Sequence, residues 1–166
     1  MKKIFTLLFT LLLFLGCGSN AADKGVVTPK LVLKNSLADL KLNNQNGQAQ
    51  TISADTKKVV LVFSKENGHA CNDFFATKNA SYLQDNKTQF VADVSSAPSL
   101  IRSMFILPGL KDFNHTILVI DNQATSSSYK TAQNSEKIVL VLVENKIITE
   151  IKYIKDVEEL QKELEK

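Results

Sequence analysis

One cysteine of this chain could do chemistry inside a folded domain. Cys71 comes after an apolar run, residues 59–63, and a polar turn that Gly68 closes. Residues 69–84 have the pattern of a helix, so the sequence predicts Cys71 close to a helix N-terminus. Backbone N–H groups and the helix dipole favour a thiolate at that position. Cys71 is therefore a candidate catalytic nucleophile.

A structural role for Cys71 competes with this interpretation. Cys71, Phe75 and Tyr82 stand at i, i+4 and i+11, which places them on one face of the predicted helix. Free cysteines are often buried and behave as small hydrophobic side chains. Both roles stay open from the residues alone, and we favour the buried one.

A metal site at the same turn is the least favoured alternative. His69, Cys71 and Asp73 alternate in the sequence, His115 could approach them, and His and Cys suit copper or zinc. However, positions i and i+2 point to different sides of a helix, so these side chains would converge only if the helix began after Cys71. We therefore expect neither a metal nor a cofactor.

Composition and motifs exclude several other functions. The chain has 166 residues, of which 44% are hydrophobic, enough for one domain with a substantial core. Its formal net charge is +3, and without Lys2 and Lys3 it falls to about +1. Such a balance argues against a nucleic-acid partner. We find no Ser-His-Asp arrangement and no glycine-rich phosphate loop.

The N-terminus predicts a lipid-anchored protein. Lys2 and Lys3 precede an apolar run, residues 4–15, that is too short to span a membrane well. The run ends in Leu-Phe-Leu-Gly-Cys, which resembles the bacterial lipobox and implies a signal peptide over residues 1–17 with lipidation at Cys17. Ordinary cleavage, giving a soluble periplasmic protein, is the alternative.

The residues after Cys17 predict a tether and an address. Residues 18–36 begin with a non-periodic stretch rich in Gly, Ala, Ser and Asn, and they form the predicted tether to a domain over residues 37–166. Residue Gly18 is not the aspartate of an inner-membrane retention signal, so we expect attachment to the periplasmic side of the outer membrane. The expected partners are that membrane and a periplasmic protein. Lipidation of Cys17 would leave Cys71 without a disulfide partner.

The order of elements in the domain predicts an α/β sandwich with a mixed central sheet and an N-terminal β-hairpin. The Asn46-Gly47 turn predicts the hairpin over residues 38–53. We expect a helix that starts near Pro98 and ends at Pro108-Gly109, with an apolar stripe at Leu100, Ile101, Met104 and Phe105, and a long polar loop over residues 122–136. The remaining predicted elements are strands at 58–63, 89–94, 116–120, 138–143 and 147–154 and a last helix after Asp156.

This order resembles the thioredoxin-like superfamily, and its hairpin is similar to that of the peroxiredoxin and TlpA-type branch. The resemblance places residues 68–71, Gly-His-Ala-Cys, at the family's Cys-x-x-Cys motif, so that glycine replaces the attacking cysteine. Ser135 or Glu136, or in another frame His115, stands at the family's cis-proline position. The strand at 116–120 and the segment after it look similar to the YtfJ-type periplasmic family, which itself lacks the Cys-x-x-Cys.

We therefore predict a degenerate thioredoxin-like domain that is a non-catalytic binding or interaction module. Dithiol exchange needs an attacking and a resolving sulfur, and only one position keeps its cysteine. The predicted partner-facing rim consists of the turn after residue 63, with Gly68 and His69, and the loop 122–136, with Ser135. The alternative is a single-cysteine thiol oxidoreductase or peroxidase that uses Cys71, for which Lys65 and His69 are the candidate activating groups.

Overall fold

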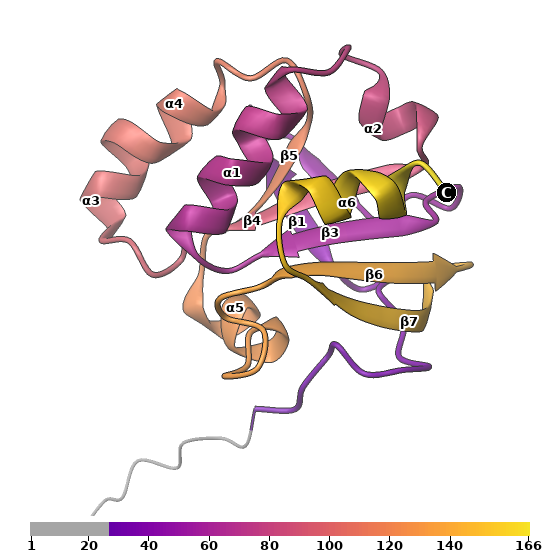
Figure 1. The fold of residues 1–166 in the computed structure, drawn as a ribbon. Helices are drawn as coiled ribbons and strands as arrows, with labels where there is room; N and C mark the ends of the chain where they lie inside the picture. The colour runs from indigo at the N-terminus through magenta and orange to yellow at the C-terminus, as the bar shows by residue number, and fades with distance from the viewer. Residues whose placement is uncertain (1–26) are drawn as a thin grey trace, which may run out of the picture.

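A seven-stranded mixed sheet forms the centre of the molecule and carries helices on both faces (Figure 1). The computed structural model describes residues 27–166, so the predicted leader, Cys17 and residues 18–26 of the predicted tether lie outside the described residues. The strand order is β2-β1-β5-β4-β3-β6-β7. The strands are β1 (Lys41–Asn44), β2 (Ala49–Thr51), β3 (Lys58–Val62), β4 (Thr88–Asp93), β5 (Ile117–Ile120), β6 (Ile138–Glu144) and β7 (Ile147–Ile154).

The three central strands, β3, β4 and β5, run parallel to one another, and antiparallel strands flank them on both sides. β4 pairs in parallel with both β3 and β5, whereas β6 runs antiparallel to β3 and β1 antiparallel to β5. Their buried runs, such as Lys58–Val62 and Ile117–Ile120, are rich in Val, Ile and Leu, as expected for strands covered on both faces. The α/β class and the mixed sheet are confirmed, and the strand predicted at 116–120 belongs to the same sheet.

The N-terminal hairpin also forms as the sequence predicts. β1 and β2 pair around a turn in which Gly47 has a φ of 79°, a left-handed conformation that glycine adopts without strain. The Asn44 side-chain oxygen accepts hydrogen bonds from the backbone N–H of Asn46 and of Gln48, both at 3.0 Å. These bonds hold the turn from inside.

Helices cover each face of the sheet with a separate apolar core. The helices are α1 (Lys65–Ala76), α2 (Tyr82–Asp85), α3 (Ser99–Ile101), the π-helical η1 (Arg102–Ile106), α4 (Leu107–Leu110), α5 (Gln123–Tyr129) and α6 (Val157–Leu164). Buried residues of α1, α2, α4 and α6 share one core, and Tyr129 of α5 joins the core on the opposite face together with Leu37 and Leu40. In residues 27–166, no helix is long and apolar enough to cross a membrane.

The helix predicted over residues 69–84 is wrong in both bounds. α1 begins at Lys65, because Ser64 caps it: the Ser64 side chain accepts a hydrogen bond of 3.3 Å from the Asn67 N–H. Gly68 thus lies inside the helix and does not close a turn. The helix ends at Ala76, where the Thr77 hydroxyl donates to the Phe74 carbonyl at 2.7 Å, and α2 is a separate short helix.

The long polar loop predicted over residues 122–136 is also wrong. Asn122 caps α5 by accepting a hydrogen bond of 2.8 Å from the Thr125 N–H, and Tyr129 anchors the helix in the core. After α5 the chain turns back to β6, and the buried Asn134 side chain donates to the Tyr129 carbonyl at 2.9 Å. The run of polar residues hid this helix, because only Tyr129 gives it an apolar side.

The helix predicted near Pro98 exists, but it neither stops at Pro108-Gly109 nor buries its predicted stripe. It continues to Leu110, and the π turn just before Pro108 replaces α-type bonding there, with the Leu107 N–H bonded to the Arg102 carbonyl. Its core-facing residues are Ile106, Leu107 and Leu110, whereas the predicted stripe is exposed.

The last residues of the predicted tether join the domain. The Lys30 N–H bonds to the Ser128 carbonyl at 2.7 Å and the Lys34 N–H bonds to the Ile148 carbonyl at 2.9 Å. Ser36 forms an isolated bridge with Ile147. The folded domain therefore begins before residue 37.

Candidate functional site

Cys71, the predicted catalytic residue, lies on the inner side of α1. Its side chain has no exposed surface and belongs to the core that includes Val60, Val62 and Phe75. Burial raises the pKa of the Cys71 thiol to about 12, because the apolar surroundings disfavour the thiolate. The thiol is therefore held in its unreactive, protonated form.

The early start of α1 removes the electrostatic support that the sequence predicted for this thiol. Cys71 stands in the middle of α1, which begins at Lys65, and not in its first turn. The field of a helix dipole falls off within that first turn. The prediction that Cys71 lies close to a helix N-terminus is thus wrong, and the reason is the cap at Ser64.

The three predicted binding residues lie toward the carboxyl end of β3. Gly68 is the fourth residue of α1, and a Cβ atom built on it would meet nothing within 4 Å. His69 is exposed, and Ser135 is half-buried in the turn before β6. Because Val62 pairs with Ile138, this turn and the start of α1 flank the same end of the sheet.

The residues considered for a metal site do not come together. His69 faces solvent, whereas Cys71 is fully buried two residues later. Within residues 27–166 no group of three or more His, Cys, Asp and Glu side chains is placed to hold a metal ion.

His115 instead belongs to a buried aromatic cluster. Its Nε2 lies 3.0 Å from the Asn72 Oδ1 of α1, and its ring centroid is 5.5 Å from that of Phe75. Its Nδ1 has no hydrogen-bond partner among the described residues. Burial lowers the pKa of His115 to about 4, so the imidazole is neutral at pH 7 and its Nε2–H donates to Asn72.

A polar network that the sequence did not reveal lies at the carboxyl ends of β4 and β5. The Ser126 hydroxyl donates to Asp93 Oδ2 at 2.6 Å, and the Ser95 N–H donates to Asp93 Oδ1 at 2.9 Å. Gln123 Nε2 donates to the Ser95 carbonyl at 2.8 Å. Both carboxylate oxygens of Asp93 accept structural bonds, so the network joins α5 to the end of β4.

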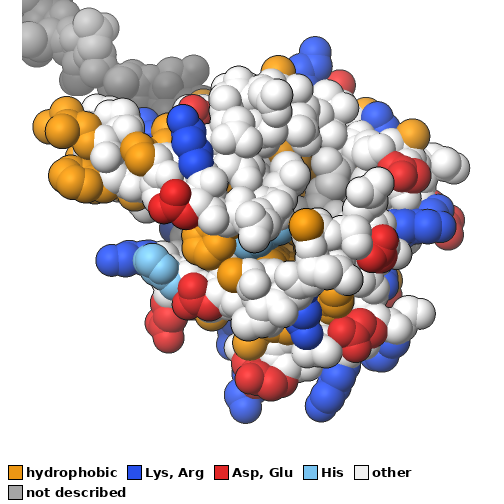
Figure 2. Space-filling view, turned by 90° about the horizontal axis from the view of Figure 1, so that it is seen from above, with side chains coloured by type: hydrophobic (Ala, Val, Ile, Leu, Met, Phe, Trp, Pro, Cys, Tyr) orange, Lys and Arg blue, Asp and Glu red, His pale blue; other side chains and the backbone are white. Residues whose placement is uncertain are grey.

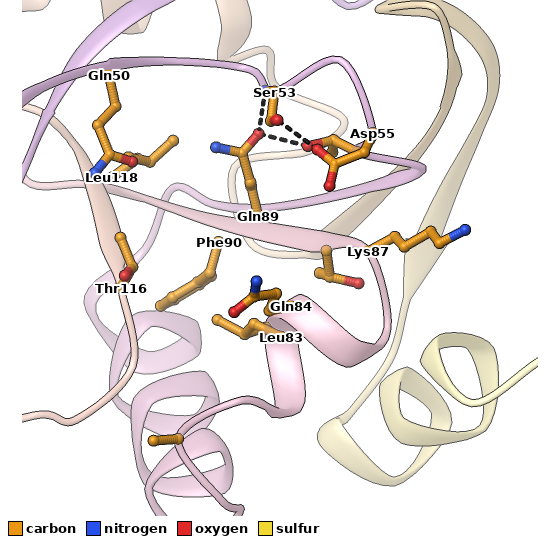
Figure 3. Close-up of a pocket in the computed structure, with 13 residues that line it drawn as sticks. Gln50, Ser53, Asp55, Leu83, Gln84, Lys87, Gln89, Phe90, Thr116 and Leu118 are labelled. Carbon is orange, nitrogen blue, oxygen red and sulfur yellow. Dashed lines mark hydrogen bonds between the residues drawn. The ribbon is translucent and has the colours of Figure 1, made fainter.

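A shallow hollow of about 320 Å³ lies at the opposite end of the parallel strands, between the hairpin and the starts of β4 and β5 (Figure 3). Gln89 points into the loop beside it, and its Oε1 accepts hydrogen bonds of 2.8 Å from the Ser53 N–H and the Thr56 hydroxyl. The polar wall of the hollow includes Gln50, Gln84 and Thr116. These amides and hydroxyls offer hydrogen bonds, and the Ser53 hydroxyl in the same lining donates to the Asp55 carboxylate.

Among solved structures, the chain is similar to a putative protein disulfide isomerase from Bacteroides thetaiotaomicron, with 14% identity, 81% of this chain and 86% of that chain covered, and a TM-score of 0.50. It is also similar to the thioredoxin domain of a thiol-disulfide oxidoreductase from Bacteroides vulgatus, with 10% identity, coverage of 81% and 96%, and a TM-score of 0.51. The fold is thioredoxin-like.

A third similar structure is a peroxiredoxin-like protein from Aquifex aeolicus, with 9% identity, coverage of 84% and 89%, and a TM-score of 0.50. No protein-family profile and no curated protein sequence matches the chain. At these identities the likeness shows the fold alone. The thioredoxin-like resemblance read from the sequence is thus confirmed at the level of the fold.

Proposed function

We propose that this protein is a redox-inactive, thioredoxin-like binding module of the bacterial envelope. One observation carries the proposal: Cys71, the single cysteine within residues 27–166, is fully buried and its thiol pKa is raised to about 12. A nucleophilic thiol needs the thiolate form and access to its substrate, and Cys71 lacks both.

The proposed partner-facing surface is the carboxyl end of β3. Gly68 and His69 of α1 and Ser135 before β6 flank this end, and the exposure of His69 suits a contact with a periplasmic protein. Substitution of His69 by Ala leaves the core intact, so a loss of partner binding in that variant would report on the surface alone.

The alternative is a single-cysteine thiol oxidoreductase or peroxidase. The names of the similar structures, a disulfide isomerase and a peroxiredoxin-like protein, favour it. That activity would require α1 to move away from the sheet, because Cys71 lies on the inner side of α1 and packs there with Phe75 and the core strands.

An activity assay with a thiol reductant distinguishes the redox-inactive module from the single-cysteine enzyme. We would compare wild type with Cys71→Ala in the reduction of hydrogen peroxide and of a protein disulfide, with dithiothreitol as the reductant and an active thioredoxin as the positive control. The proposal expects the same background rate in both variants. A rate in wild type that Cys71→Ala loses would establish the enzyme.

The envelope address belongs to the same proposal. The lipobox-like sequence ending at Cys17 supports a lipid anchor on the periplasmic side of the outer membrane, and a kinship with the YtfJ-type family would fit that address. Labelled palmitate should enter wild type but not Cys17→Ala. Equal labelling of the two variants would refute the anchor.

A further inference from the structure

The helix formed by residues 99–110 presents a large apolar face to solvent. Leu100, Ile101, Met104 and Phe105 are exposed by 64%, 44%, 58% and 64%, and we call these four side chains the apolar helix face. Figure 2 shows hydrophobic side chains gathered in a protruding cluster at the left, where α3 and η1 lie. Contiguous exposed apolar patches on a soluble domain mark interaction sites.

This exposure is built into the helix and does not result from poor packing. Ile106, Leu107 and Leu110 pack on the core from the opposite side of the same helix. The π turn of η1 contains the exposed Met104 and Phe105 and the core-facing Ile106, and π turns are frequent at functional sites. The helix is thus apolar on two sides, of which one has no partner within residues 27–166.

The charges of the segment suit a lipid surface. Residues 95–112 contain Arg102 and Lys111 and one acidic residue, the exposed Asp112, so the segment keeps a small positive charge. Arg102 keeps its charge while it donates to the Ala97 carbonyl at 2.9 Å, and Lys111 is exposed at the end of the helix. Interfacial helices combine exposed large apolar side chains with Lys and Arg, which attract anionic lipid headgroups.

The described chain enters the domain beside α5, which also contacts the segment that leads into the apolar helix. Lys30 is bonded to Ser128 of α5, and Gln123 at the other end of α5 is bonded to the carbonyl of Ser95, which leads into the apolar helix. Figure 1 shows α5 and the start of the described chain below the sheet, and α3 at the left on the other side of it. A flexible linker as long as residues 18–26 reaches roughly 16 Å, so an anchor at Cys17 would hold the domain near a bilayer.

We propose that the apolar helix face docks onto the surface of the membrane to which the N-terminus is attached. Leu100, Met104 and Phe105 enter the boundary between headgroups and acyl chains, and Lys111 stays among the headgroups. The inference rests on the lipid anchor of the proposed function only for proximity to the bilayer.

A single tryptophan tests the docking, because the chain contains none. We would reconstitute the full chain into vesicles of phosphatidylethanolamine and phosphatidylglycerol with brominated acyl chains, using Phe105→Trp. Tyr153→Trp is the matched control, because Tyr153 is an exposed aromatic residue on β7, at the far edge of the sheet. An interfacial helix buries its apolar face about 5–10 Å deep, so Phe105→Trp should shift to the blue and lose roughly half of its emission, and Tyr153→Trp should change little.

The outcomes separate this inference from the anchor. Quenching of Phe105→Trp in protein that carries no lipid on Cys17 would support the docking without help from the anchor. Lipidated protein in which Phe105→Trp is quenched no more than Tyr153→Trp would keep the anchor and overturn the docking. A blue shift of Phe105→Trp that grows with protein concentration in the absence of vesicles would also overturn it, because the occupant would then be a second copy of the chain.

Discussion

At the scale of single residues, His115 carries the clearest pH dependence of this fold. It is buried and neutral beside Asn72, and burial lowers its pKa from 6.5 to about 4. Between these two values the unfolded chain binds a proton that the folded chain does not bind. The free energy of unfolding must therefore rise with pH through this interval, and the contribution of His115 is complete above pH 6.5.

We expect His115→Gln to flatten the pH dependence of stability, because the Gln amide can still donate to Asn72 but cannot titrate. Wild type should lose up to roughly 3 kcal/mol between pH 6.5 and 4 beyond what the variant loses. Urea unfolding at a series of pH values measures the difference. His69→Gln is the control, since His69 is the other histidine and is exposed. Identical slopes in wild type and His115→Gln would contradict the account.

The sequence could reveal the burial of Cys71 but not its distance from the start of the helix. The spacing of Cys71 and Phe75 predicted that they share a helix face, and both are buried in one core. A reactive Cys71 would need the helix to begin close to it. The helix begins earlier, because Ser64 caps it four residues before Gly68, the residue that the sequence suggested as its boundary. Local capping competes with the turn preference of glycine, and the sequence alone does not weigh the two.

At the scale of elements, the sheet was easier to predict than the helices. Each strand is a run of β-branched or alternating residues, so β3, β5 and β6 could be located within a residue or two. The hairpin carried an Asn-Gly signal and α6 an Asp156 cap with Glu159 three residues later, whose N–H bonds to Asp156 at 2.9 Å.

Helix α5 could not be predicted because its stability comes from a cap and from tertiary contacts. Its residues, QATSSSY, have weak helix propensity, and Tyr129 and Ser126 are held by the core and by Asp93. The sequence also could not show that the apolar helix face is exposed. Periodicity shows which residues share a face of a helix, but not whether other elements cover that face.

The cap of α5 gives a prediction at this scale. Asn122→Ala should lower the free energy of unfolding by about 0.5–2 kcal/mol, because the Thr125 N–H loses its acceptor. Asn122→Asp keeps an acceptor and should stay close to wild type. Denaturant unfolding measures both, with Ser127→Ala, at an exposed position of the same helix, as the control. If Asn122→Ala matched Ser127→Ala, the cap would have no energetic role.

At the scale of the whole molecule, two regions available for function lie at opposite ends of the parallel strands. The start of α1, the turn with Ser135 and the apolar helix face lie toward the carboxyl ends, and the polar hollow beside Gln89 lies at the amino ends. The sequence predicted the first region from the resemblance of residues 68–71 to a redox motif. It gave no signal for the hollow, whose lining comes from separate segments.

Alkylation of Cys71 over a range of pH shows whether the folded domain keeps this thiol buried and protonated. Iodoacetamide is applied to the full chain, and the peptide that contains Cys71 is measured by mass, so that Cys17 does not interfere. Native protein should stay unmodified at Cys71 from about pH 6 to 9, and protein unfolded in urea should react with an ordinary pKa of about 8.5. Reaction of the native protein with an apparent pKa well below that value would contradict the account and make Cys71 an active thiol.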